Sequence, residues 1–109
     1  MVVNNSSEVV LSAVDKMSIA FDLPDTDSVI APEQRLQEVR MMLVQRIIGL
    51  LNTNPEKLMA ILYRIDVSEA AVNEVFGTAF PPDVPELLAD LIIERQLAKA
   101  ETRRHHSSS

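Results

Sequence analysis

Apolar residues recur every three or four positions along most of this chain, the spacing that places them on one face of an α-helix. This pattern predicts four or five helices joined by short polar or proline-containing segments. The predicted helices cover residues 8–21, 32–51, 55–65, 68–76 and 84–102. A strand is the alternative for the first of them, where valine is frequent.

Residues with known preferences for helix ends support these boundaries. Pro32 suits the first turn of a helix, and Asn54 precedes Pro55 in the order of an N-cap and a first-turn proline. Gly77 is a natural C-terminal cap for the fourth helix. The predicted fold is therefore all-α, a compact bundle of four to five helices with the two longest helices as its main pair.

The same pattern divides the chain into three parts. Residues 1–7 form a polar start that we expect to be flexible, residues 8–102 form a single helical domain, and residues 103–109 form a polar tail that we expect to be disordered. The longest apolar run, residues 41–51, is far shorter than the ~20 residues that span a bilayer. The start of the chain has no basic segment typical of a signal peptide. We therefore expect a cytoplasmic protein without membrane contact.

Composition narrows the chemistry that the chain can perform. It has 109 residues, with only two glycines and no cysteine. Two glycines cannot build a phosphate-binding loop, and without cysteine there is no disulfide, no thiolate zinc site and no cysteine nucleophile. The formal net charge of −6 argues against nucleic-acid binding, because phosphate contacts supply most of that affinity.

One stretch resembles the helix-turn-helix motif of DNA-binding proteins. Its apolar and helix-starting positions are filled by Ile65, Val67, Ser68, Val72 and Phe76. Asp66 takes the turn position where glycine is usual, and aspartate tolerates left-handed backbone better than most residues. The second helix would present Glu69, Asn73 and Glu74 to DNA, and residues 65–90 hold six acids and no base. We therefore expect a structural corner rather than a DNA reader. A degenerate helix-turn-helix regulator that acts through a partner protein is the alternative.

Two arginines fall on apolar helix faces. At about 100° per residue, Arg40 lies near the middle of the apolar arc of the 32–51 helix, and Arg95 lies near the centre of the apolar face of the 84–102 helix. Such a charge must reach solvent or bond a carboxylate, because stranding it inside costs several kcal/mol. Ion pairs with a neighbouring helix are favoured, with Asp66 as a candidate partner. The alternative is a cleft that binds an anionic ligand or a partner's carboxylate.

Both long helices carry more apolar surface than a lone domain of this size needs. Met41 and Ile48 widen the apolar arc of the 32–51 helix, whereas Ile93 and Leu97 fall opposite the core face of the last helix. A central place in the bundle or an oligomer contact would explain the excess. We therefore expect these four residues to form the interaction surface, in a homodimer or with a partner protein.

Candidates for catalysis or metal binding are poor. Five carboxylates gather on one side of the last helix, and a solvated acidic face is the simplest explanation. They are Asp83, Glu86, Asp90, Glu94 and Glu101. The histidines, His105 and His106, lie in the tail, whereas a di-iron bundle needs histidines beside its carboxylates. We predict no catalytic residue, no metal and no cofactor. A small-ligand or metal-binding enzyme that uses the acidic face is the alternative.

The segments Ile61–Glu69 and Leu91–Gln96 resemble parts of small bacterial helical proteins without an established function. The resemblance covers part of the C-terminal half of the chain. It implies a bacterial, cytoplasmic setting and brings no activity with it. Together with the surplus apolar surface, this leads us to predict a non-enzymatic protein–protein interaction module.

Overall fold

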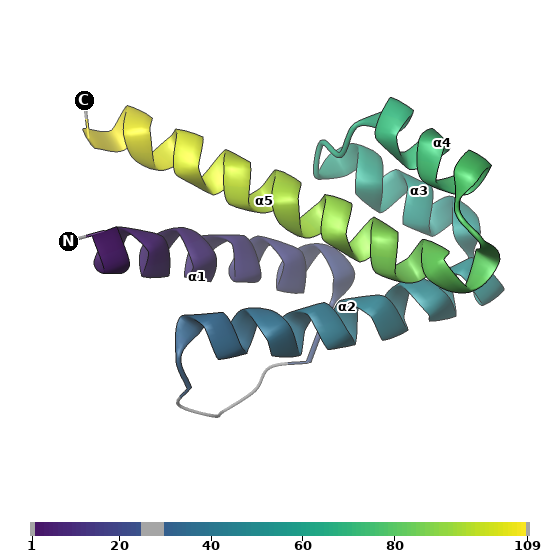
Figure 1. Ribbon diagram of the computed structural model, residues 1–109, viewed down its shortest axis with the longest axis horizontal. Helices are drawn as coiled ribbons and strands as arrows, with labels where there is room; N and C mark the ends of the chain where they lie inside the picture. The colour runs from purple at the N-terminus through teal and green to yellow at the C-terminus, as the bar shows by residue number, and fades with distance from the viewer. Residues whose placement is uncertain (1, 25–29, 109) are drawn as a thin grey trace.

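The computed structural model describes residues 2–24 and 30–108, with side chains described from residue 7 to residue 103 in these ranges. The described residues form five α-helices and a short 3-10 turn, which confirms the predicted all-α bundle (Figure 1). The elements are α1 (Val2–Phe21), α2 (Pro32–Thr53), α3 (Pro55–Arg64), α4 (Glu69–Thr78), η1 (Pro81–Asp83) and α5 (Val84–Ser108). α5 runs opposite to α1 and α2, and the α3–α4 pair lies at the end of the molecule away from the chain termini (Figure 1).

The two terminal helices extend past their predicted limits. α1 begins at Val2 rather than at residue 8, and α5 ends at Ser108 rather than near residue 102. Residues 2–7 and 103–108, which the apolar pattern left outside the predicted helices, therefore continue them. Apolar periodicity stops where a helix leaves the core, whereas its backbone hydrogen bonds need no apolar face to continue. Met1 and Ser109 lie outside the described residues.

Capping side chains begin two of the helices, and residues with a left-handed backbone conformation follow the ends of two. The side chain of Asn54 accepts a backbone N–H from the first turn of α3 at 3.2 Å, as expected of an N-cap. Ser68 caps α4 in the same way, also at 3.2 Å. α1 and α3 are both followed by an aspartate with positive φ, 54° at Asp22 and 68° at Asp66. This left-handed geometry turns the chain out of the helix.

Gly77 does not cap α4, contrary to the sequence prediction. It lies inside the helix, which ends at Thr78, and no described glycine has a positive φ. The N–H of Ala79 and the hydroxyl of Thr78 donate to carbonyls of the last turn instead. Because these carbonyls already have donors, no left-handed glycine is needed.

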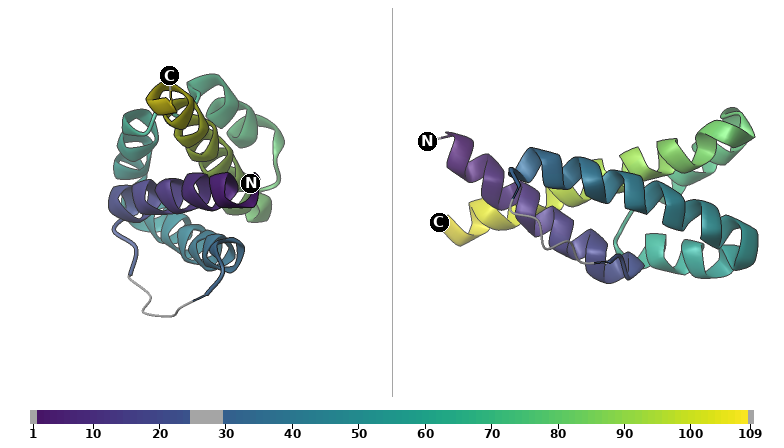
Figure 2. Two further views of the ribbon diagram at one scale, coloured as in Figure 1. Left: turned by 90° about the vertical axis from the view of Figure 1, so that its left-hand side faces the viewer. Right: turned by 90° about the horizontal axis from the view of Figure 1, so that it is seen from below.

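α5 is the central helix, since it packs against α1, α2 and α4, while α3 packs on α2 (Figure 2). Fully buried side chains from three helices form the middle of the core. They are Met17 and Phe21 of α1, Leu43 and Ile47 of α2, and Leu88 and Ile92 of α5. Burying a side chain of this kind stabilises the fold by ~1.5–3 kcal/mol relative to leaving it exposed. Within residues 2–24 and 30–108, each helix is too short or too polar to cross a bilayer.

Candidate interaction surface

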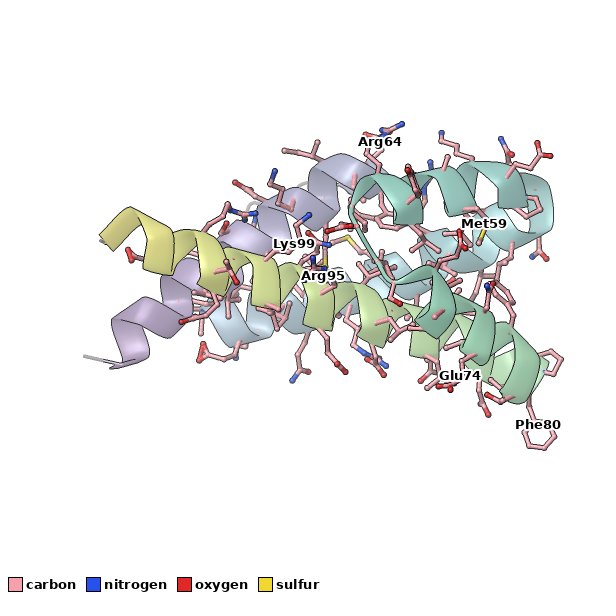
Figure 3. The ribbon with its side chains drawn as sticks, turned by 90° about the horizontal axis from the view of Figure 1, so that it is seen from above. Met59, Arg64, Glu74, Phe80, Arg95 and Lys99 are labelled. Carbon is pink, nitrogen blue, oxygen red and sulfur yellow. The ribbon has the colours of Figure 1, made fainter. Side chains whose placement is uncertain are left out.

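Arg95 and Asp66 form an ion pair that fixes the turn between α3 and α4. Figure 3 shows Arg95 and Lys99 on α5, on the side of that turn. Arg95 donates from Nε to the carbonyl oxygen of Asp66 at 3.0 Å and from a terminal nitrogen to Asp66 Oδ2 at 2.8 Å. Beside it, the buried Gln96 donates to the carbonyl oxygen of Ile65 at 2.9 Å, and Lys99 approaches the same oxygen at 3.4 Å. The hydrogen bond and charge of Arg95, followed by the charge of Lys99, lower the pKa of Asp66. These three side chains of α5 hold the end of α3, which gives Arg95 a structural role.

Arg40 also pairs with carboxylates of α5. Its Nε donates to Asp90 Oδ1 at 3.0 Å, and a terminal nitrogen lies 3.8 Å from Glu86 Oε1. The hydrogen bond to Asp90 raises the pKa of Arg40 against a smaller opposing effect of desolvation, so the guanidinium stays charged. Arg46, which the sequence did not single out, donates to the carbonyl oxygen of Phe21 at 3.1 Å. The two arginines therefore tie α2 to α5 and to the end of α1.

Ile93 and Leu97 do not form an exposed surface, contrary to the sequence prediction. Ile93 is buried in the core, and Leu97 is half-buried against it. The prediction assumed that α5 buries one stripe, as a helix on the surface of a bundle does. α5 is instead covered on several sides by α1, α2 and α4.

Met41 and Ile48 are exposed, with 69% and 37% of their surface open to solvent. They lie on the side of α2 turned away from the buried residues Leu43 and Ile47. They belong to a larger surface, because every exposed residue of α2 from Gln34 onward is uncharged. We call this set the α2 outer face; it comprises Gln34, Gln37, Met41, Gln45, Ile48, Gly49, Asn52 and Thr53.

The charged residues of α2 beyond its first turn are all half-buried. Glu33 is exposed at the start of the helix, and the remaining charged residues are half-buried. These are Arg35, Glu38, Arg40 and Arg46. Met41 and Gln45 also line a groove beside the end of α1, together with Leu23, Pro24, Met42 and two charged residues, Asp22 and Arg46. Depletion of charge combined with methionine, as on the α2 outer face, is typical of the centre of a protein interface.

The sequence predicted Met41 and Ile48 but not the uncharged residues between them. The helical projection considered apolar positions only, so it gave no weight to glutamine and asparagine. Plotting the charged residues of α2 on the same projection leaves one arc without charge, formed by Gln34, Gln37, Met41, Gln45, Ile48 and Asn52, whereas Glu38 falls between Gln45 and Gly49. That arc is the signal by which the α2 outer face could have been found.

α3 and α4 form the predicted helix-turn-helix-like corner. Asp66 adopts the left-handed geometry expected at the turn position. Glu69, Asn73 and Glu74 are exposed, and α4 contains no lysine or arginine. The helix that would enter a DNA groove therefore carries two exposed acids and one exposed amide, a charge that is unfavourable beside phosphates.

The acidic residues of α5 are not arranged as a metal site in the described part of the chain. There, no three histidine, aspartate or glutamate side chains lie close enough to hold a metal ion. Glu86 and Asp90 instead pair with Arg40. The side chains of His105 and His106 lie outside the described residues.

Neither a protein-family model, nor a characterised protein, nor a solved structure matches this chain. The resemblance of Ile61–Glu69 and Leu91–Gln96 to small bacterial helical proteins therefore stays a prediction. A proposal for the function therefore starts from the surface itself, above all from the exposed and uncharged residues of the α2 outer face.

Proposed function

We propose that this protein is a non-enzymatic interaction module that pairs with a second copy of itself through the α2 outer face. The observation that carries the proposal is the lack of charge among the exposed residues of α2 between 34 and 53, in a chain of which 24% is charged. A helix face turned to water is normally rich in charged residues. On the α2 outer face, by contrast, the most exposed large apolar residue, Met41, has 69% of its surface open to solvent.

The composition of this face suits pairing with itself. A two-fold contact places the same surface patch on both sides, so a charged residue at its centre meets its own copy. Amide side chains avoid that repulsion, because each one both donates and accepts hydrogen bonds. Gln37, Gln45 and Asn52 supply such groups beside Met41 and Ile48. With 22 residues, α2 provides a face ~33 Å long.

Gly49 is a further reason to expect a helix–helix contact. A Cβ atom added at Gly49 would meet nothing within 4 Å, so packing inside the chain does not require glycine there. Glycine within a helix costs ~1 kcal/mol relative to alanine. The close approach of a second helix backbone, which glycine permits, would offset this cost.

Sedimentation equilibrium of the full chain over a wide concentration range tests the proposal. We expect a reversible dimer for the natural sequence and a monomer for Met41→Glu, because the substitution sets two carboxylates against each other across the two-fold axis. Ile19→Glu is the matched control: Ile19 is 79% exposed, but it lies on α1. It should dimerise like the natural sequence.

Two results would contradict the proposal. One is a natural chain that stays monomeric at every concentration. The other is an equal loss of association in Met41→Glu and Ile19→Glu, which would show that added charge rather than the α2 outer face is responsible. Association with a different protein through the same face would appear as binding that Met41→Glu alone removes.

A further inference from the structure

The α2 outer face continues into the groove beside the end of α1. This groove, which we call the α1–α2 groove, encloses about 460 Å³, and four of its lining residues are apolar: Leu23, Pro24, Met41 and Met42. Met41 and Gln45 belong to both surfaces, since they lie one turn apart on the exposed side of α2. Whatever covers the α2 outer face therefore also reaches the mouth of the groove.

The turn that ends α1 builds one wall of the groove. Asp22 follows the helix with a φ of 54°, and Leu23 donates its N–H back to the carbonyl oxygen of Ser18 at 2.9 Å. This turn places the side chain of Leu23 against the core. Arg46 ties α2 to the same turn, because its Nε donates to the carbonyl oxygen of Phe21 at 3.1 Å. The walls are therefore held by hydrogen bonds, and little conformational entropy is lost when a partner fills the groove.

The lining of the groove suits an uncharged, apolar side chain. Its charged residues are one acid, Asp22, and one base, Arg46, so it carries no net charge that would select an ion. Leu23 and Met42 are half-buried and pack against the core, which leaves part of their apolar surface in contact with water. An apolar group that enters the groove removes this surface from water, which favours binding.

We propose that the α1–α2 groove receives Met41 of a second copy, so that each chain of the dimer inserts one methionine into the other. This inference rests on the proposed self-association through the α2 outer face. A two-fold axis at Met41 places the partner's Met41 directly beside it, and therefore beside the groove that Met41 lines. Methionine is unbranched and flexible, which suits insertion into an open groove. The contact also covers a side chain that is 69% exposed in the single chain.

Methyl NMR of a mixed-label dimer of the natural sequence tests the inference. One sample carries protonated methionine methyls and a second carries protonated leucine methyls, each in an otherwise deuterated chain. The two are mixed at a concentration where the chain is dimeric. We expect a nuclear Overhauser effect between the methyl groups of Met41 and Leu23, which in this mixture arises only between copies. Leu11, 46% exposed on α1, is the control and should show none.

Matched variants measure the same contact in sedimentation equilibrium. Leu23→Ala and Met41→Ala should each weaken self-association about tenfold, whereas Leu11→Ala should change it less than about twofold. Because Leu23→Ala and Met41→Ala remove one shared contact, the double variant should lose clearly less than the roughly hundredfold expected of independent losses. Leu23 also packs against the core, so urea unfolding at low concentration measures separately how far Leu23→Ala affects the fold.

A dimer without the Met41–Leu23 signal, or with independent losses in the double variant, would overturn the inference while self-association stands. A chain that stays monomeric would contradict both proposals. The dye 1-anilinonaphthalene-8-sulfonate distinguishes a free apolar ligand as the occupant: its fluorescence per chain should fall as the dimer forms, because the partner's Met41 occupies the groove. Equal dye binding by monomer and dimer that Leu23→Ala removes would assign the groove to a small molecule and overturn the inference.

Discussion

At the scale of single residues, aspartate rather than glycine carries the left-handed backbone of this chain. Asp22 and Asp66 have positive φ, whereas neither described glycine does. In both cases, the next residue donates its N–H back into the last turn of the helix, from Leu23 to Ser18 at 2.9 Å and from Val67 to Leu62 at 3.0 Å. Gly49 and Gly77 lie inside helices instead.

The sequence predicted one of these two turns. Asp66 was identified because the helix-turn-helix pattern marks its position, whereas nothing marks Asp22 within a segment that holds three aspartates and a proline. The carboxylate of Asp66 also binds Arg95. The ion pair between Asp66 and Arg95 could be predicted from their opposite charges. The hydrogen bond from Arg95 to the carbonyl oxygen of Asp66 depends on how α5 packs beside the turn and could not be predicted.

Acid should weaken the α3–α4 corner through Asp66. Its pKa lies below the ordinary value of 3.8, because Arg95 and Lys99 favour the ionised form. The unfolded chain therefore binds this proton more readily, so the contribution is complete well above pH 4 and is lost as the pH falls through the folded-state pKa. Urea unfolding at about pH 7 and pH 3 should show a larger loss of stability for the natural chain than for Asp66→Asn. Equal losses would show that the Arg95 contact does not depend on ionisation.

At the scale of elements, α5 is the central helix of the bundle. Its contacts with α1, α2 and α4 explain why the sequence predicted the wrong exposure for some of its residues. Periodicity predicts which residues of one helix share a face, but not how many neighbours cover that helix. Ile93 was therefore assigned to an outer surface, although it is buried. α2 shows the reverse case, since it has a true outer face and the sequence identified two of its members, Met41 and Ile48.

Gln96 joins α5 to α3, and replacing it should destabilise the whole fold. Gln96→Leu puts an apolar side chain of similar size in place of the amide and removes the 2.9 Å hydrogen bond to the carbonyl oxygen of Ile65. That oxygen would keep only the longer contact with Lys99, so we expect a loss of ~1–2 kcal/mol in the free energy of unfolding by urea. Lys99→Met, which removes the 3.4 Å contact, should cost less. The opposite order would show that Gln96 does not anchor α3.

The two glycines offer a matched pair for testing the role of α2. Both lie in helices, and a Cβ atom added to either would meet nothing within 4 Å. Gly49→Ala and Gly77→Ala should therefore each stabilise the monomer by ~0.5–1 kcal/mol in chemical unfolding at low concentration. Only Gly49→Ala should also weaken the dimer in sedimentation, because only Gly49 lies on the α2 outer face. Unchanged association in Gly49→Ala would rule out close helix contact at that residue.

At the scale of the whole molecule, the fold was predictable, and the surfaces were predictable only in part. Apolar spacing together with Pro32, Asn54 and Pro55 was enough to predict an all-α bundle. Which side of a helix stays exposed depends on how the helices pack against one another. The apolar spacing within one helix does not predict that packing. For that reason the small pocket between α3 and α4, lined in part by Met59 and Tyr63, appears only once α3 is seen to pack on α2 and α4 on α5.

The central claim is that two copies of the chain meet at the α2 outer face, and site-directed cross-linking tests it most directly. The chain has no cysteine, so Met41→Cys introduces a single thiol at the position that the proposal places on the two-fold axis, and Ile19→Cys introduces one on α1. Under mild oxidation at a concentration where the natural chain is dimeric, Met41→Cys should form a disulfide-linked dimer, and Ile19→Cys should stay largely monomeric on a non-reducing gel. Equal cross-linking of the two variants, or none in Met41→Cys, would contradict the account.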